Sequence, residues 1–155
     1  MDIYRLFNEL KIEYEEHIHE PVYTIEQANA LKDQPEGTGC KNILIADKKG
    51  ENFALMIIHQ DKRADLKAAA ALLGLKKPRF AKEDELMQLM HLTPGSVSPF
   101  GLINDAEHKV SVLLDSDLQG LRLLFHPNDN SKTVAISCDD LMRFLSHCGN
   151  RCIFL

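Results

Sequence analysis

The sequence has no tryptophan, few aromatic residues and no long hydrophobic run. Phenylalanine and tyrosine together make up 6% of the 155 residues. Apolar runs such as 43–46 and 53–58 are much shorter than the roughly 20 residues that a membrane-spanning helix needs. The first residues show no basic leader followed by an apolar stretch. We therefore expect no secretion signal, no membrane partner and a cytoplasmic location.

Cysteines are also few, and their spacing is poor for a metal. No C-x-x-C pair occurs among the four, which are Cys40, Cys138, Cys148 and Cys152. Cys148 and Cys152 lie near His147, but a structural zinc site needs about four ligands in matched pairs, and the second pair is missing. The sequence predicts reduced cysteines, no metal site and no cofactor.

The composition suits one folded domain. A chain with 45% hydrophobic and 26% charged residues is typical of a globular protein and excludes a disordered one. A length of 155 residues is enough for one hydrophobic core and too short for two ordinary domains. We predict a single domain over residues 1–155.

The charge is unevenly distributed along the chain. The net charge is −5, yet segment 41–82 carries ten basic and four acidic residues. The flanking segments 1–40 and 83–155 are both acidic. Two interpretations stay open for segment 41–82: a basic surface that binds a polyanion, and a set of solvated lysines.

Hydrophobic periodicity and turn residues predict a mixture of helices and strands. Helices are expected over 2–11, 24–31, 65–73, 82–90 and 139–147. Strands are expected over 14–19, 41–46, 53–59, 79–81, 110–114, 121–125 and 133–137, with loops at 33–39 and 93–101. Hairpins are more frequent than regular βαβ units in this pattern. The sequence therefore predicts an α+β fold with a mixed, largely antiparallel sheet and surrounding helices.

Lys41 is the first candidate for chemistry. It begins an apolar strand, and strand alternation places it on one face with Ile43 and Ile45. Such a lysine either extends into water at the sheet edge or points into a polar pocket. In a pocket it could bind a phosphate or polarise a carbonyl group.

Two further candidates lie in loops. Gly95 begins a G-x-x-x-P segment, whose backbone N–H groups could stabilise an oxyanion or which could be a plain turn. His126 ends a predicted strand at a turn, where it could reach a pocket or be held by turn hydrogen bonds. The other histidines, His17 and His19 among them, are expected to be structural or exposed. Nucleophile-elbow, Walker and dinucleotide-binding motifs are all missing.

Four segments, taken in order, resemble a known family. They are His19–Glu26, Cys40–Leu44 with Asp47–Gly50, Gly95–Leu102, and His126–Asn130 with Thr133. Together they resemble the YbaK/ProX family of aminoacyl-tRNA deacylases, the editing domains associated with prolyl-tRNA synthetase. The S-V-S-P-F-G-L and H-P-N-D-N segments are most similar to the freestanding Ala-tRNA(Pro) deacylases. Glu20 and Ser131–Lys132 depart from the usual pattern of the family.

The resemblance implies hydrolysis of the ester that joins a wrong amino acid to tRNA(Pro), with the substrate's ribose hydroxyl assisting. It implies that Lys41, Gly95 and His126 act at the ester. It also implies substrate contacts from Asn42, Ile45, Ser96, Ser98, Pro99, Phe100 and Gly101. The expected partners are the acceptor end of aminoacyl-tRNA(Pro) and prolyl-tRNA synthetase, with no DNA.

Three alternatives stay open. The first is a Cys-tRNA(Pro) deacylase, whose pocket cannot be distinguished from the sequence. The second is a noncatalytic, synthetase-associated module that only binds tRNA. The third is a generic small-molecule-binding domain, which no specific motif indicates.

Overall fold

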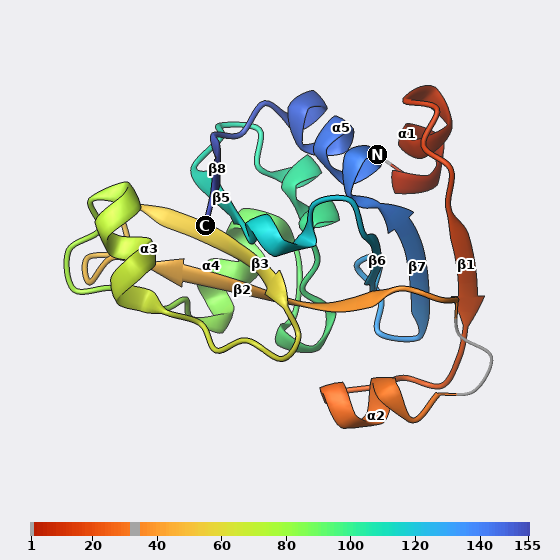
Figure 1. The fold of residues 1–155 in the computed structure, drawn as a ribbon. Coiled ribbons are helices and arrows are strands. Elements are labelled where there is room, and N and C mark those ends of the chain that lie inside the picture. The colour runs from red at the N-terminus through yellow and green to blue at the C-terminus, as the bar shows by residue number, and fades with distance from the viewer. Residues whose placement is uncertain (1, 32–34) are drawn as a thin grey trace.

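The computed structural model describes residues 2–31 and 35–155 (Figure 1). The strands are β1 (Glu15–Ile18), β2 (Thr38–Ala46), β3 (Phe53–His59), β4 (Arg79–Phe80), β5 (Val110–Leu114), β6 (Arg122–Phe125), β7 (Lys132–Ser137) and β8 (Cys152–Phe154). The α-helices are α1 (Ile3–Glu9), α2 (Ile25–Asn29), α3 (Leu66–Leu73), α4 (Glu83–Met90) and α5 (Cys138–Cys148). Short 3₁₀ helices cover Pro94–Ser96, Pro99–Asn104 and Ser116–Leu118.

The strands form one mixed sheet of eight. Its order is β1-β7-β6-β2-β3-β5-β8, and β4 pairs with β2 beside this path. Three pairings are parallel: β2 with β6, β3 with β5, and β5 with β8. The prediction of a largely antiparallel sheet is therefore wrong. Parallel neighbours need long crossover connections, and such pairing leaves no mark on the local sequence.

The sheet separates two hydrophobic cores. Along β3, alternate side chains face opposite sides, so that Phe53, Leu55 and Ile57 join the larger core while Ala54, Met56 and Ile58 join the smaller one. Helices α1, α4 and α5 contribute to the larger core, and α3 covers the smaller one. Because β3 is buried on both faces, it reads as a continuous apolar run.

Four phenylalanines form the centre of the larger core. The ring of Phe100 lies 5.1 Å from Phe7, 5.7 Å from Phe125 and 5.2 Å from Phe144, each with an edge-to-face geometry. Such aromatic pairs add to the stabilisation from burial. Phe100 thereby anchors the segment that follows Gly95 to the core.

Local signals set most element boundaries. Asp65 caps α3 through the N–H of Ala68, and Gly74 ends this helix with a left-handed φ of 70°. Thr24 caps α2 as predicted. Strand β2 begins at Thr38, three residues earlier than expected, and β8 was not predicted. Of the loop expected at 33–39, residues 33 and 34 lie outside the described residues.

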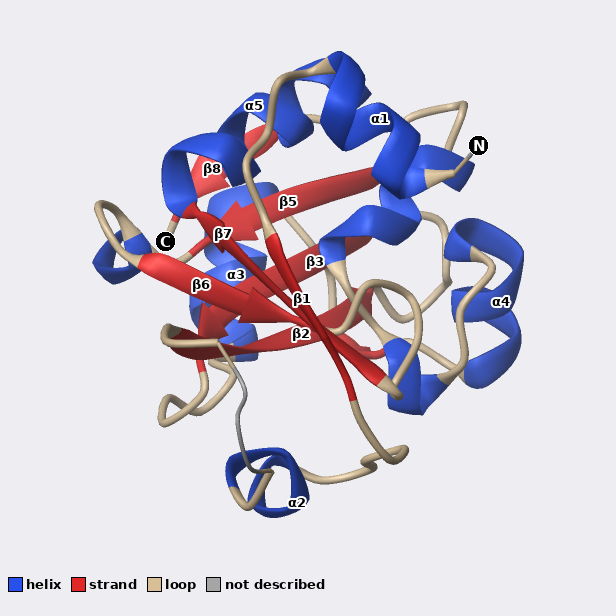
Figure 2. Cartoon of the chain, turned by 90° about the vertical axis from the view of Figure 1, so that its right-hand side faces the viewer, coloured by secondary structure: helices blue, strands red, loops and turns tan. Residues whose placement is uncertain are grey.

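Helix α2 projects from the body of the molecule. Figures 1 and 2 show it below the sheet, after the chain that leaves β1. Its five residues include none that is buried. Within 2–31 and 35–155, no helix has the length and apolar character needed to cross a membrane.

Candidate functional site

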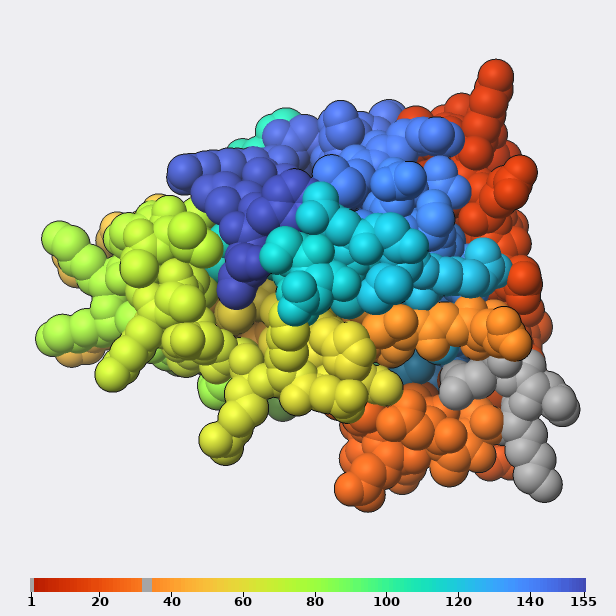
Figure 3. Space-filling model, in the orientation of Figure 1, coloured from red at the N-terminus to blue at the C-terminus, as the bar shows by residue number. Residues whose placement is uncertain are grey.

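A cavity of about 280 Å³ lies where β2 changes its partner. Thr38 and Gly39 pair with β6, whereas Cys40 to Ala46 pair with β3. Figure 3 shows the molecule hollowed between α2 and β2. The lining residues come from the α2 segment (Val22, Tyr23, Thr24, Ile25, Ala28, Asn29), from β2 and the residue after β3 (Gly39, Cys40, Lys41, Asn42, Ile43, Gln60), and from the later segments (Pro94, Gly95, Val97, Leu124, Phe125, His126, Thr133). Its volume is close to the lower end of small-molecule sites.

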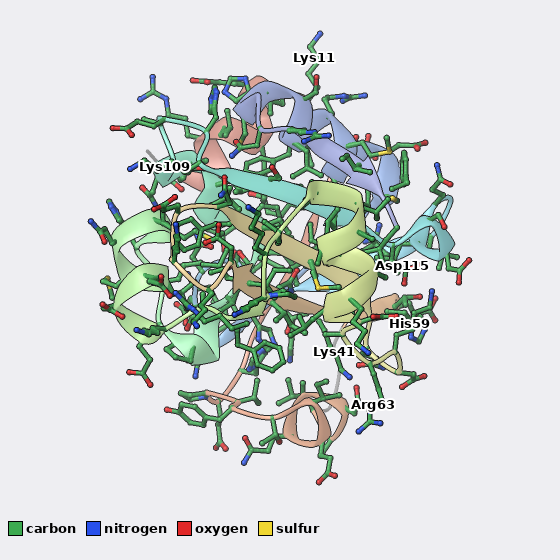
Figure 4. The ribbon with its side chains drawn as sticks, turned by 90° about the vertical axis from the view of Figure 1, so that its left-hand side faces the viewer. Lys11, Lys41, His59, Arg63, Lys109 and Asp115 are labelled. Carbon is green, nitrogen blue, oxygen red and sulfur yellow. The ribbon has the colours of Figure 1, made fainter. Side chains whose placement is uncertain are left out.

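Lys41 lines this cavity and is held at its amino group. Its Nζ donates a hydrogen bond of 2.7 Å to the backbone oxygen of Lys62. Lys62 is in turn fixed by Asp115 and Asp117, each with an oxygen 2.7 Å from the Lys62 Nζ. Lys41 thus contributes to the cavity wall, while its amino group is bonded to the backbone at an exposed position. Figure 4 shows Lys41 and Asp115 on the same side of the molecule.

Ser98 joins the Gly95 loop to the turn that follows His126. Its hydroxyl donates to Asn128 Oδ1 at 2.6 Å and accepts from the N–H of Phe100 at 3.2 Å. Asn128 has a left-handed φ of 61°, which asparagine tolerates better than most residues. The N–H of Ser96 is bound to the oxygen of Thr93 at 3.0 Å. This backbone group is therefore bonded within its own turn. Of Gly95, Ser96 and Ser98, only Gly95 lines the cavity.

His126 lies in the cavity wall beside His19. The two ring centroids are 5.9 Å apart, and His19 Nε2 lies 2.8 Å from Thr133 Oγ1. Burial, with a smaller contribution from His19, holds the pKa of His126 below its usual value. His126 is therefore neutral at pH 7. Folding thus brings His19 to Thr133, a residue that is distant from it in the chain.

The cavity offers no strong protein nucleophile. Burial raises the pKa of the Cys40 thiol to about 12, so this thiol is not ionised at neutral pH. No aspartate or glutamate of the described residues lines the cavity. Across the same described ranges, no three His, Cys, Asp or Glu side chains are grouped so that they could hold a metal ion.

The structure brings four of the ten predicted site residues to the cavity: Lys41, Asn42, Gly95 and His126. The other six do not line it. Ile45 lies in the core covered by α3, since its side chain follows the alternation of β2. Pro99, Phe100 and Gly101 are buried in the 3₁₀ helix that anchors the Gly95 loop, and Ser98 is also buried. Ser96 is half-buried in the preceding turn.

Sequence reasoning missed much of the opposite wall. The segment 22–29 lines the cavity through both the entry to α2 and the helix itself, and Gln60 and Thr133 complete the wall. Only the Thr24 cap and the His19–Glu26 motif were visible in the sequence. Neither signal indicates which side chains face a cavity, because α2 and β2 line the same cavity only in the folded chain.

The basic segment 41–82 divides into two groups in space. Lys41, Lys62 and Arg63 lie at the cavity end of β2 and β3. Lys48, Lys49, Lys76 and Lys77 lie at the other end, where the N–H of Lys48 donates to the oxygen of Lys76 at 3.0 Å. The two groups are separated by roughly 20 Å along the strands, at ~3.3 Å per residue. These two groups hold seven of the ten basic residues of the segment.

Comparisons with known proteins identify the class. Residues 19–144 match the family model of the aminoacyl-tRNA editing domain. The chain is 40% identical over 144 residues to the prolyl-tRNA editing protein ProX of Acetoanaerobium sticklandii, which covers 92% of this chain and 88% of that protein. It is 32% identical over 130 residues to prolyl-tRNA synthetase associated domain-containing protein 1 of Danio rerio, covering 82% and 70%.

Solved structures share the fold. A crystal structure of a protein described as a proposed trans-editing enzyme for prolyl tRNA synthetase has a TM-score of 0.73 and 18% identity, covering 99% of this chain and 93% of that one. The family model, which matches most of the chain, defines the class as an aminoacyl-tRNA editing domain. The chain belongs to the aminoacyl-tRNA editing domain family, as its motifs predicted, and is an aminoacyl-tRNA deacylase.

Proposed function

We propose that this chain removes alanine from mischarged Ala-tRNA(Pro) in trans, as a freestanding editing enzyme. The similarity to ProX supports tRNA(Pro) as the substrate. The observation that carries the proposal is the small cavity that joins Lys41, Gly95 and His126 without a carboxylate in its described lining. A synthetase pocket built for proline cannot strongly reject alanine, since small size differences are worth only ~1–3 kcal/mol. A second, smaller site removes the error.

In the proposed mechanism, protein groups orient the ester and water attacks it. Lys41 binds near the ester and the terminal phosphate, and its hydrogen bond to Lys62 holds the amino group in place. The N–H of Gly95 stabilises the carbonyl oxygen as negative charge develops on it. Neutral His126 shapes the aminoacyl pocket. An aminoacyl ester is already activated, so positioning supplies much of the rate enhancement.

The tRNA acceptor end is the proposed partner at the cavity. Lys41 and Arg63 lie at this end of the molecule, as Figure 4 shows. Contacts to phosphates dominate recognition of an RNA duplex. The names of the relatives also support association with prolyl-tRNA synthetase as part of this proposal.

Deacylation of purified Ala-, Cys-, Ser- and Pro-tRNA(Pro) tests the function. Ala-tRNA(Pro) should be hydrolysed fastest, and Pro-tRNA(Pro) should be spared. Lys41→Ala should lower the rate on Ala-tRNA(Pro) by on the order of 10²-fold with the fold intact, because it removes one preorganised charge. Faster hydrolysis of Cys-tRNA(Pro) would instead identify a cysteine-specific enzyme. Binding without turnover of any of the four would leave a tRNA-binding module.

The terminal ribose hydroxyl is proposed to orient the attacking water. Single-turnover hydrolysis of alanyl-tRNA(Pro) ending in 2′-deoxyadenosine should be nearly abolished, whereas filter binding should change little, since phosphates supply most of the affinity. An unchanged rate would transfer this role to a protein base. His126, neutral at pH 7, would then be the first residue to replace.

A further inference from the structure

The Thr133 hydroxyl is held in one hydrogen-bonding role at the wall of the cavity. The residue is 2% exposed and lines the cavity from β7. Its Oγ1 lies 2.8 Å from His19 Nε2, and His19 Nδ1 lies 2.6 Å from the backbone oxygen of Glu20. The backbone of His19 is itself held in place, because its backbone N–H donates to the backbone oxygen of Ser131 at 2.8 Å.

These contacts determine which atom donates. A backbone carbonyl can only accept, so Nδ1 of His19 must carry a hydrogen, and in the neutral form of an imidazole ring this hydrogen is the only one. Nε2 then carries a lone pair, and the hydrogen bond with Thr133 forms only if the Thr133 hydroxyl donates. The hydrogen of Thr133 is thus committed to His19, and the remaining lone pairs of Oγ1 are the part of this group available to the cavity.

The ligand group that matches such an oxygen is a hydrogen-bond donor. The described lining holds no carboxylate, so a cationic or neutral amine has to be recognised by neutral acceptors. Asn42 adds a second acceptor, because its Oδ1 is buried and has no hydrogen-bond partner among the described residues. The α-amino group is the donor that every aminoacyl ester carries. Its N–H groups can donate to such neutral acceptors.

We propose that Thr133 Oγ1 accepts a hydrogen bond from the α-amino group of the aminoacyl ester, and that His19 is the positioning residue that fixes the Thr133 hydroxyl for this contact. The inference rests on the proposed function, since it concerns the same ester in the same cavity. It adds a recognition element for the amino group to the groups that act at the ester itself.

The test compares alanyl-tRNA(Pro) with propionyl-tRNA(Pro), which lacks only the α-amino group. Single-turnover rates at subsaturating enzyme are measured for each variant relative to wild type on the same substrate, so that the intrinsic reactivities of the two esters cancel. Thr133→Val should lose about ten- to a hundredfold on the alanyl ester, as expected for a hydrogen bond to a charged group, and about nothing on the propionyl ester. Thr133→Ser, which keeps the hydroxyl, should stay within a few fold of wild type on both.

His19→Phe separates the positioning role from simple packing. It frees the Thr133 hydroxyl to rotate, so it should lower the alanyl rate by less than Thr133→Val and leave the propionyl rate unchanged. In the Thr133→Val background it should have no additional effect, because the group it orients is gone. If Thr133→Val does not fold, the His19→Phe comparison of the two substrates decides the matter alone.

The outcomes distinguish this inference from the proposed function. If wild type hydrolyses alanyl-tRNA(Pro) but both esters lose the same factor in Thr133→Val, or neither loses any, the α-amino contact is overturned and the deacylase assignment stands. If wild type hydrolyses neither ester, the proposed function fails and the inference fails with it.

Discussion

Two glycines of one segment lie in opposite environments. A methyl group added at Gly95 would make ordinary contacts, 3.4 Å from Tyr23 Cδ1 and 3.7 Å from Asn130 Nδ2. At Gly101 the added carbon would lie 2.6 Å from Leu92 Cδ1 and 3.1 Å from Met90 Cε, in the packed core. The protein itself would therefore accept a methyl group at Gly95, whereas at Gly101 a methyl group would collide with the packed core.

The matched variants Gly95→Ala and Gly101→Ala should separate activity from stability. Gly95→Ala should unfold at the same urea concentration as wild type but lose at least about tenfold in deacylation, because the methyl group displaces the ester from its position. Gly101→Ala should lower the free energy of unfolding by about 1–3 kcal/mol through overpacking. A Gly95→Ala protein with the wild-type rate would remove this loop from the mechanism.

At the scale of elements, one ion pair joins β4 to the start of α4. The Glu85 carboxylate accepts from Arg79 Nη1 at 2.7 Å, from Arg79 Nη2 at 3.0 Å and from the N–H of Lys82 at 2.8 Å. The two-pronged contact with Arg79, helped by the Lys82 N–H, lowers the pKa of Glu85 to about 2. The Glu85 carboxylate thus holds the start of α4 and the short strand β4 together.

This contact predicts a pH-dependent contribution to stability. The unfolded chain protonates Glu85 near its ordinary pKa of 4.5, whereas the folded chain does so near 2. The stabilisation is therefore present above about pH 4.5 and is lost as the pH falls toward 2. Glu85→Gln should lower the free energy of unfolding at pH 7 by about 1–2 kcal/mol.

Urea unfolding at pH 7, 4 and 3 measures this effect. The difference between Glu85→Gln and wild type should shrink as the pH falls, and the exposed neighbour Glu83→Gln is the matched control on the same helix. A difference that stays constant from pH 7 to pH 3 would show that the charge of Glu85 does not stabilise the fold.

At the scale of the whole molecule, the fold decides how many basic groups a tRNA can meet at the cavity. The charge of Lys62 is compensated by Asp115 and Asp117. Arg63 is exposed and has no ion pair among the described residues. Lys109 pairs with Glu107 at 3.2 Å and lies on another part of the surface (Figure 4).

Arg63→Gln should therefore weaken tRNA binding and reduce its salt dependence. If Arg63 contacts one phosphate, the slope of log K against log salt should become shallower by about 0.7–0.9. Lys109→Gln should change neither quantity. Filter binding between 50 and 200 mM salt, a range in which such slopes are measurable, provides the data. Equal slopes for Arg63→Gln and wild type would place the acceptor end elsewhere.

The sequence by itself determined most of the local structure. Caps such as Asp65 and Gly74, and the apolar alternation of β3, depend on residues that are neighbours in the chain, so a local pattern suffices to predict them. The motifs also indicated Lys41, Gly95 and His126, which the structure places in one cavity. Their chemical roles stay predictions.

Tertiary structure alone decided the strand partners and the rest of the cavity. The parallel pairing of β3 with β5 joins strands about fifty residues apart along the chain. The contact between His19 and Thr133 spans 114 residues. Ile45 and Phe100 are apolar residues within or beside the motifs, yet their side chains fill the cores. Which face of an element is buried, and against what, depends on contacts that form only when distant segments pack together, and no periodicity of a single segment records them.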